Sequence, residues 1–101
     1  MDIATAQRLA WENKKAKGFN TTDVALEFGL LTAEVSEAFT AWCRKEGQLG
    51  EELADVFLYL TALAEMNGVD LASEVAAKID KNARRVYARN EDGVLVRVSD
   101  A

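Results

Sequence analysis

Proline is absent from this chain of 101 residues, and apolar side chains recur at three- and four-residue intervals through most of its length. Proline interrupts helices, and the apolar spacing places side chains along one face of an α-helix. The two features together predict an all-α fold. Glycines divide the periodic sequence into segments, and glycine is the residue that most often ends a helix. We therefore expect several helices joined by short turns.

The positions of the glycines and of capping residues predict four helices and a short tail. The predicted helices cover residues 2–17, 23–45, 48–66 and 70–89, with Thr22 or Asp23 as the cap of the second and Asp70 as the cap of the fourth. Gly18, Gly47 and Gly68 are expected to end the first three helices. In residues 90–101 valines alternate with other side chains, which predicts a strand-like tail that is either an edge contact or a frayed end.

Length and charge restrict the class of protein. A chain of 101 residues has room for a small core, so residues 1–101 are expected to form a single domain. The formal net charge of −5 argues against duplex nucleic acid as a partner, because binding to phosphates needs a basic surface. The sequence shows neither an apolar run long enough to cross a bilayer nor a signal pattern at its N-terminus. These features predict a cytoplasmic protein with no membrane partner.

The side chains available for chemistry are also restricted. Histidine is absent, and Cys43 is the single cysteine. The lack of histidine removes the commonest general base and every triad built on imidazole. One cysteine forms neither an internal disulfide nor a cysteine-based zinc cluster. Any chemistry must therefore rest on carboxylates, lysines or a metal ion.

Two acidic pairs have the same internal spacing and occur in neighbouring predicted helices. They are Glu34 with Glu37 and Glu52 with Asp55. At about 100° per residue, the second acid of each pair falls about 60° from the first, and the apolar stripe of each helix begins on the other side. The two helices therefore present the same layout, with acids along one border of an apolar face.

A short turn around Gly47 predicts that these helices pack as an antiparallel hairpin with an approximate two-fold axis. Equivalent positions would then face each other, and four carboxylates would share a partly buried space in which they repel and take up protons. One or two Mg²⁺ or Mn²⁺ ions would resolve this conflict, because both ions prefer oxygen ligands. The alternative is an ordinary amphipathic hairpin whose acids form a solvated rim.

The fourth helix carries a polar row. Lys78, Asn82 and Arg85 are four and three residues apart and lie on one face, where they would either hold phosphates or form an ordinary solvated surface. Both interpretations stay open. The three lysines near the end of the first helix, Lys14, Lys15 and Lys17, are expected to be solvated.

Two aromatic residues are candidates for contact with a ligand. Tyr59 follows Asp55 by one helical turn, so its ring is expected beside the acids, with its hydroxyl on a polar partner. Trp42 lies near the middle of the apolar stripe, where it is either a core residue or the wall of a pocket for a base.

The three motifs taken in order, Glu34-x-x-Glu37, Glu52-x-x-Asp55 and Lys78-x-x-x-Asn82-x-x-Arg85, resemble the MazG-like all-α nucleoside triphosphate pyrophosphatases, including their dCTP pyrophosphatase branch. The resemblance covers about residues 26–87 and includes the run from Asp55 to Leu60. The chain differs from many relatives in having no proline after Tyr87, and it lacks the histidine-containing segment that precedes Gly29 in the dCTP branch. The resemblance therefore does not identify the preferred base.

The resemblance implies a four-helix bundle that is completed by association into homodimers or homotetramers. It implies hydrolysis of a ribo- or deoxyribonucleoside triphosphate to the monophosphate and pyrophosphate, which requires Mg²⁺ or, as a substitute, Mn²⁺, and which would serve to clean nucleotide pools. The implied catalytic residues and metal ligands are Glu34, Glu37, Glu52 and Asp55, and the resemblance implies that Lys78 and Asn82 contact the triphosphate, with Arg85 as a further candidate. Tyr59 and Trp42 are candidates for binding the substrate from their positions alone. Either Glu34 or Glu37 would orient the attacking water.

A second hypothesis assigns no chemistry to the chain. In it, the chain is a helical, homo-oligomeric interaction module, its acids form a solvated rim and the apolar rows of the hairpin bind a partner. Dependence on a divalent metal separates the two hypotheses.

Overall fold

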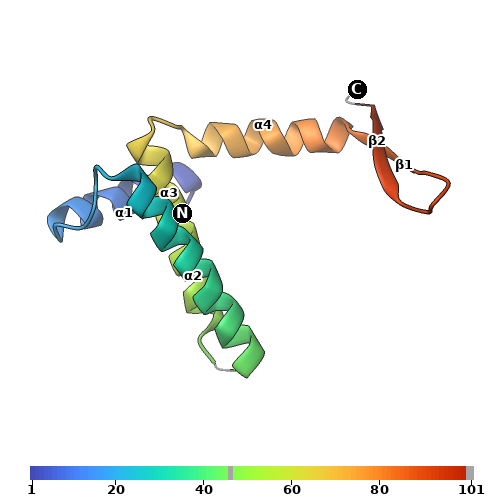
Figure 1. Cartoon of the computed structure of the whole chain (residues 1–101). Helices are drawn as coiled ribbons and strands as arrows, with labels where there is room; N and C mark the ends of the chain where they lie inside the picture. Colours follow the sequence, from blue (N-terminus) through green and yellow to red (C-terminus); the bar gives the residue numbers. More distant parts are fainter. Residues whose placement is uncertain (46, 100–101) are drawn as a thin grey trace. The chain divides into compact units, whose positions relative to one another are not determined.

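The computed structural model describes residues 1–45 and 47–99, and within these residues it has four helices and two strands (Figure 1). In chain order these are α1 (Ile3–Ala16), α2 (Val24–Arg44), α3 (Leu49–Met66), α4 (Leu71–Arg84), β1 (Val86–Arg89) and β2 (Leu95–Ser99). The all-α class is confirmed, with one small two-stranded sheet added. The chain divides into two compact units, Met1–Leu71 and Ala72–Ala101.

Aspartates begin the first two helices. The side chain of Asp2 accepts a hydrogen bond of 2.7 Å from the backbone N–H of Thr5, and that of Asp23 accepts one of 3.0 Å from the N–H of Leu26. Such caps satisfy N–H groups that have no partner inside the helix. Of the two caps considered for α2, Asp23 is therefore the one that the chain uses.

The helix ends follow the glycines at two of three positions. Gly18 and Gly68 have left-handed backbone with φ of 72° and 65°, as expected for residues that end a helix. The prediction for Gly47 was wrong, because Lys45 takes the left-handed conformation with φ 55° and is the C-cap of α2. The chain turns as soon as α2 ends at Arg44, before it reaches the glycine.

The first unit is built on the hairpin of α2 and α3, which lie side by side, with α1 packed against α3 (Figure 1). Its core is made mainly of small side chains, with one leucine; the buried apolar residues are Ala38, Ala41, Ala62, Leu63 and Ala64. Small residues at a helix contact allow the helices to approach closely. The predicted antiparallel packing of the two acid-bearing helices is therefore confirmed.

Part of the predicted apolar stripe is not buried. Val35 on α2 and Leu53 on α3 are 51% and 54% exposed, and Trp42 is 62% exposed. The expectation that Val35 and Leu53 face a core was wrong within one chain, and of the two alternatives for Trp42 the core position is not the one observed. The hairpin therefore presents large apolar side chains on its surface.

A side-chain amide links α1 to the end of α3. Gln7 is buried, and its Nε2 donates hydrogen bonds of 2.9 Å to Glu65 Oε2 and of 3.1 Å to the carbonyl oxygen of Val69. A buried amide needs such partners, because an unsatisfied one costs free energy. This link fixes α1 against the hairpin.

The second unit contains α4 and a β-hairpin. Helix α4 ends at Arg84, so the prediction of a helix through residue 89 was wrong. Residues 86–89 instead form β1, which pairs antiparallel with β2 so that Tyr87 faces Arg97 and Arg89 faces Leu95. Gly93, with φ 77°, lies in the turn between the strands. The strand-like tail is therefore one arm of a hairpin, and its last two residues, 100 and 101, lie outside the described part of the chain.

Within residues 1–45 and 47–99, no helix combines the length and the apolar content that crossing a membrane requires.

Candidate metal and nucleotide site

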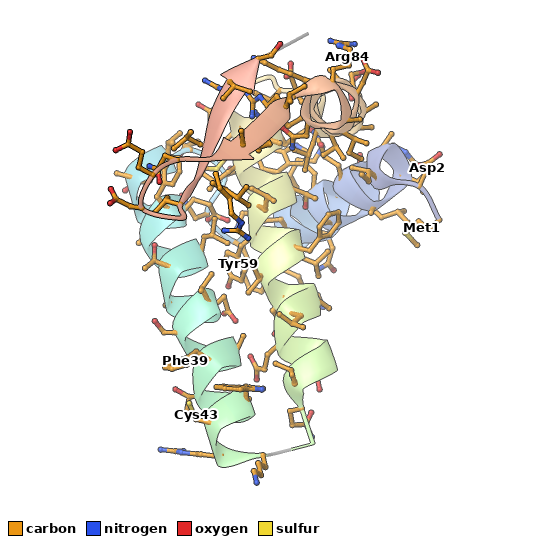
Figure 2. The ribbon with its side chains drawn as sticks, turned by 90° about the vertical axis from the view of Figure 1, so that its right-hand side faces the viewer. Met1, Asp2, Phe39, Cys43, Tyr59 and Arg84 are labelled. Carbon is orange, nitrogen blue, oxygen red and sulfur yellow. The ribbon has the colours of Figure 1, made fainter. Side chains whose placement is uncertain are left out.

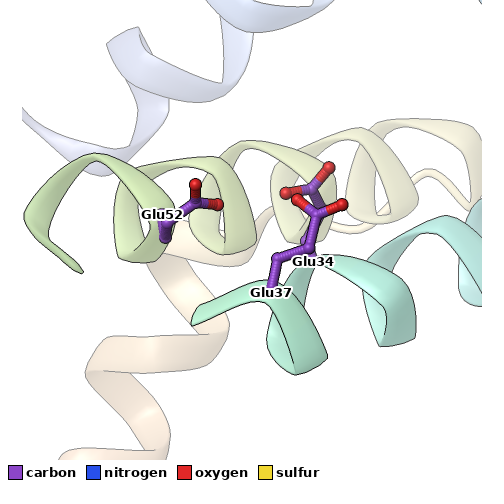
Figure 3. Close-up of side chains that lie close together, drawn as sticks. All are labelled: Glu34, Glu37 and Glu52. Carbon is purple, nitrogen blue, oxygen red and sulfur yellow. The ribbon is translucent and has the colours of Figure 1, made fainter. Parts of the chain in front are cut away.

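Acidic residues from α2 and α3 converge in the first unit. One carboxylate oxygen each of Glu34, Glu37 and Glu52 lies within 4.8 Å of the others. Figure 3 shows the carboxylates of Glu34 and Glu37 next to each other on α2, with Glu52 reaching from the facing helix. The spacing of the two pairs put these acids on corresponding faces, and the close packing of the hairpin brings the faces together. The predicted convergence is thus observed for three of the four acids.

Asp55, the fourth acid, is half-buried on α3 and is not part of this three-residue cluster. Its side chain is one methylene shorter than that of glutamate, so it reaches less far from its helix. Its charge nevertheless raises the pKa of Glu34. Asp55 therefore belongs to the same electrostatic environment as the cluster.

The electrostatics of the cluster are unfavourable for an ionised Glu34. Burial raises the pKa of Glu34 above its ordinary value, and the negative charges of Glu37, Asp55 and Glu52 raise it further. Glu34 Oε2 is buried and accepts no hydrogen bond from any residue within 1–45 or 47–99. A buried carboxylate oxygen without a donor, among like charges, is an arrangement that a cation stabilises.

An open pocket adjoins the cluster. Glu37, Glu52, Ser36 and Thr40 line a pocket of about 300 Å³. Glu37 is exposed, whereas Glu34 and Glu52 are half-buried. The acids therefore border a space that solvent or a ligand can enter.

Tyr59 lies beside the acids, as expected from its position one turn after Asp55. Burial raises the pKa of its hydroxyl, and the charges of Glu34, Glu27, Asp55 and Glu37 raise it further. Figure 2 labels Tyr59 on α3, while Phe39 and Cys43 lie in the half of α2 nearest the turn. Tyr59 also lines a second pocket of about 140 Å³.

Trp42 lies elsewhere on the hairpin. Its ring stacks on that of Phe39, with centroids 6.1 Å apart and planes 24° apart, and it lines a pocket with Cys43, Lys45 and Leu49. It is not a core residue of the single chain. A contact between Trp42 and a substrate stays a prediction.

The basic row belongs to the second unit. Lys78 and Asn82 are exposed on α4, and Arg85 follows the end of that helix, with its Nη1 donating a hydrogen bond of 3.0 Å to Asn82 Oδ1. Arg84, which precedes Arg85, forms an ion pair with Asp80 instead. The prediction that all three residues lie on the fourth helix was wrong for Arg85, because α4 ends at Arg84. The binding of phosphates by Lys78, Asn82 and Arg85 stays a prediction.

Sequence reasoning missed a buried ion pair in the first unit. Lys14 Nζ lies 2.9 Å from Glu27 Oε2, and Glu27 is fully buried. The expectation that Lys14 is solvated was wrong, because its side chain turns towards Glu27 rather than to water. One available signal was the position of Glu27 two helical turns before Glu34, which puts both on nearly the same face of α2.

Comparisons with known proteins agree with this fold. Residues 25–100 match the MazG-like family, and since the match spans most of the chain, the chain belongs to that family. A solved relative is the cyanophage S-2L MazG-like pyrophosphohydrolase bound to dGDP and three catalytic Mn²⁺ ions per active site; its TM-score is 0.70 at 21% identity over 97% of this chain and 93% of that one. At this identity the likeness shows the fold.

Curated relatives are longer proteins. The chain is 40% identical over 70 residues to a dATP/dGTP diphosphohydrolase of Salmonella phage PMBT28, which covers 69% of this chain and 23% of the relative. It is 39% identical over 61 residues to dCTP pyrophosphatase 1 of Bos taurus, which covers 59% of this chain and 36% of the relative. The chain thus matches only about a quarter to a third of the length of these relatives.

Proposed function

We propose that this protein is a nucleoside triphosphate pyrophosphohydrolase that depends on Mg²⁺, with Mn²⁺ as a substitute, and converts a ribo- or deoxyribonucleoside triphosphate to the monophosphate and pyrophosphate. The convergence of Glu34, Glu37 and Glu52 within 4.8 Å carries this proposal. The names of the relatives support it, because all of them describe the hydrolysis of nucleotides. A role in cleaning nucleotide pools in the cytoplasm follows from the proposed reaction.

The donor set fits a hard divalent cation. The cluster offers only carboxylate oxygens, which are the ligands that Mg²⁺ and Mn²⁺ prefer. The buried Glu34 Oε2 accepts no hydrogen bond within the described residues, and burial and the nearby negative charges raise the pKa of Glu34. Glu34, Glu37, Glu52 and Asp55 would hold the ions.

The protein's own groups then have separate tasks. When bound, the metal would supply positive charge to the triphosphate and would lower the pKa of a water. Either Glu34 or Glu37 would orient this water, and Glu37 is the better placed, because it is exposed and lines the open pocket. The oxygen of Glu37 that does not hold metal would accept the proton as the water attacks phosphorus and the bond to the departing pyrophosphate breaks.

The basic row of α4 is proposed to hold phosphates. Lys78 offers an ammonium, Asn82 an amide and Arg85 a guanidinium, and the last two are joined by the hydrogen bond between their side chains. Charged donors make the stronger hydrogen bonds to phosphate oxygens. Lys78 would therefore offset part of the charge of the departing pyrophosphate.

We further propose that the chain acts as a homodimer or homotetramer. The apolar residues Val35 and Leu53 on the hairpin and Ile79 on α4 are each more than half exposed. Helix α4 has no buried residue. A second copy of the chain would cover such surfaces, and analytical ultracentrifugation should show a dimer or tetramer at micromolar concentrations. A monomer at these concentrations would contradict this part of the proposal.

A substrate panel tests the proposed reaction. The four common ribo- and four deoxyribonucleoside triphosphates are incubated with the protein and Mg²⁺, and the release of pyrophosphate is measured separately from that of single phosphate. We expect pyrophosphate and the monophosphate in equal amounts from at least one nucleotide, and no release when a chelator removes the metal. Release of single phosphate would contradict the proposed bond cleavage, and no release from any nucleotide would support the interaction module.

A further inference from the structure

A second pocket lies in the first unit beside Tyr59. Its volume is about 140 Å³, and its lining includes Lys14, Phe19, Glu27, Tyr59 and the amide of Asn13. The space would hold several waters or one flat ring. Two of the lining residues are aromatic and two are oppositely charged, which is the composition of a pocket that binds a planar, polar ligand.

The two charged residues form a fixed pair. Lys14 Nζ lies 2.9 Å from Glu27 Oε2, and Asn20 Nδ2 donates a hydrogen bond of 3.2 Å to Glu27 Oε1. The side chains of Lys14 and Glu27 are 11% and 0% exposed. Asn20 in turn bonds to the backbone of Asp23, where α2 begins. The direction of the Lys14 ammonium is therefore set by α1, by α2 and by the loop between them.

This pair is not required for packing alone. Replacing a buried ion pair by apolar residues of similar volume is often neutral or stabilising, so stability alone does not account for the pair of Lys14 and Glu27. An ammonium has three N–H donors and no acceptor. Glu27 Oε2 lies 2.9 Å from the ammonium as an ion pair, and the ammonium lies 5.5 Å from the centroid of the Tyr59 ring. A further acceptor would reach Lys14 from the pocket that it lines.

Tyr59 joins this pocket to the acidic cluster. Its ring lines the pocket, and it follows Asp55 by one helical turn on α3. Glu27, which also lines the pocket, precedes Glu34 by two turns on nearly the same face of α2. A nucleotide with its base in the pocket would therefore have its phosphates near the acids.

We propose that Lys14 determines base specificity, by donating a hydrogen bond to an exocyclic carbonyl oxygen of a nucleobase in this pocket. The inference rests on the proposed function and names the substrate class of that site. Guanine presents two adjacent acceptors, O6 and N7, whereas adenine has an amino group at the position of O6. A lysine therefore favours guanine over adenine, and Glu27, whose Oε2 lies 2.9 Å from Lys14 Nζ, orients the ammonium.

The test compares dGTP with dATP, which share size, sugar and phosphates. The wild-type protein should have a kcat/KM for dGTP at least about tenfold above that for dATP, because one well-placed contact to a base edge discriminates by this much or more. The nucleotide dITP keeps O6 and N7 but lacks the 2-amino group, and it should behave like dGTP. In the variant Lys14→Met/Glu27→Gln, which removes both charges at nearly constant volume, the ratio should fall to about one.

The matched control is Lys15→Met. Lys15 is exposed and lies 3.8 Å from Glu12, outside the pocket, so this variant should keep the wild-type ratio. A double variant that discriminates as the wild type does would overturn the proposal, and so would a wild-type ratio near one. If the wild type hydrolyses no nucleotide, it is the proposed function that fails.

A binding measurement does not depend on hydrolysis or on the folding of a variant. In equilibrium dialysis without metal, the wild-type protein should bind dGMP at least about tenfold more tightly than dAMP. Equal affinities, or no binding of either, would overturn the assignment of Lys14 whatever the outcome for catalysis.

Discussion

The two units of this chain differ in what they bury. The first unit encloses charged groups, including the fully buried Glu27, its partner Lys14 and the half-buried Glu34 and Glu52. The second unit has a helix with no buried residue and a two-stranded sheet whose side chains are almost all exposed. Burying charge costs free energy, and exposing apolar surface forgoes stabilisation. Neither pattern follows from the stability of one isolated chain.

The difference indicates which binding partner would stabilise each unit. In the first unit the unfavourable feature is a carboxylate cluster, which a divalent cation would stabilise. In the second unit it is an uncovered apolar face, which a second copy of the chain would cover. In the proposed function, the first unit would hold the metal, while the second would contribute basic side chains and surface for association.

The largest effect is expected from a change in the acidic cluster. Glu52→Gln keeps the shape of the side chain but removes its charge, and it should lower kcat/KM by about 100-fold or more, since even groups behind the ligands of a metal contribute 10- to 100-fold. Glu51→Gln is the matched control, because Glu51 is the exposed neighbour on the same helix and should change activity less than twofold. Steady-state release of pyrophosphate measures both. Full activity of Glu52→Gln would contradict the assignment of the chemistry to the acidic cluster of the first unit.

A smaller effect is expected from the basic row of the second unit. Lys78→Ala should raise KM for the triphosphate by about tenfold, the loss of one charge-assisted phosphate contact. Arg84→Ala removes the same charge from α4 six residues further on and about 120° around the helix axis, where Arg84 already pairs with Asp80, and KM should stay within about twofold. Equal effects of the two variants would mean that α4 contributes only general positive charge.

The dependence of the protein's stability on pH should report on the acidic cluster of the first unit without any substrate. The pKa of Glu34 is raised by burial and then by Glu37, Asp55 and Glu52, so the folded chain holds this proton to higher pH than the unfolded chain does. Between the unfolded value of about 4.3 and the raised folded value, the metal-free protein should lose stability as the pH rises. Thermal unfolding across this range measures the slope.

Two controls sharpen this experiment. Saturating Mg²⁺ should reduce the loss, because the cation replaces the proton in the cluster. Glu34→Gln, which has no proton to lose at this position, should flatten the slope. A slope unchanged by both would show that another group controls the stability.

The smallest effect is expected at the turn of the hairpin. Lys45 has φ 55°, a conformation that costs a non-glycine residue free energy, so Lys45→Gly should raise the free energy of unfolding by about 0.5–1 kcal/mol. Gly47 is not in the left-handed region and a Cβ there would meet no atom within 4 Å, so Gly47→Ala should not destabilise the protein. Chemical denaturation measures both variants. If Gly47→Ala lowered the free energy of unfolding and Lys45→Gly left it unchanged, Gly47 rather than Lys45 would be the residue that ends α2.

Much of the first unit could be predicted from the sequence. The helices follow from the apolar period and the capping aspartates, and the convergence of the acids follows from the equal spacing within two helices joined by a short turn. These features depend on local geometry. The buried pair of Lys14 and Glu27 could not be predicted in this way, since the two residues are on different helices and only packing brings them together.

The second unit was less predictable for a related reason. The helical pattern of α4 continues in the sequence through Val86 and Tyr87, but both residues also favour strands, and the pairing with Arg97 and its neighbours decides between the two states.

In the first unit, the exposure of Val35, Leu53 and Trp42 was not evident from the sequence, because an apolar stripe does not reveal whether it packs within one chain or against another.

Calorimetric titration with Mn²⁺ tests the central claim most directly, because it asks whether Glu34, Glu37 and Glu52 hold a divalent cation before any nucleotide is added. The wild-type protein should bind Mn²⁺ in a saturable manner, with affinity that increases as the pH rises and Glu34 loses its proton. Glu37→Gln should bind at least about tenfold more weakly, whereas Glu51→Gln should bind as the wild type does. Equal Mn²⁺ affinity in all three proteins, or no binding by the wild type, would contradict the account.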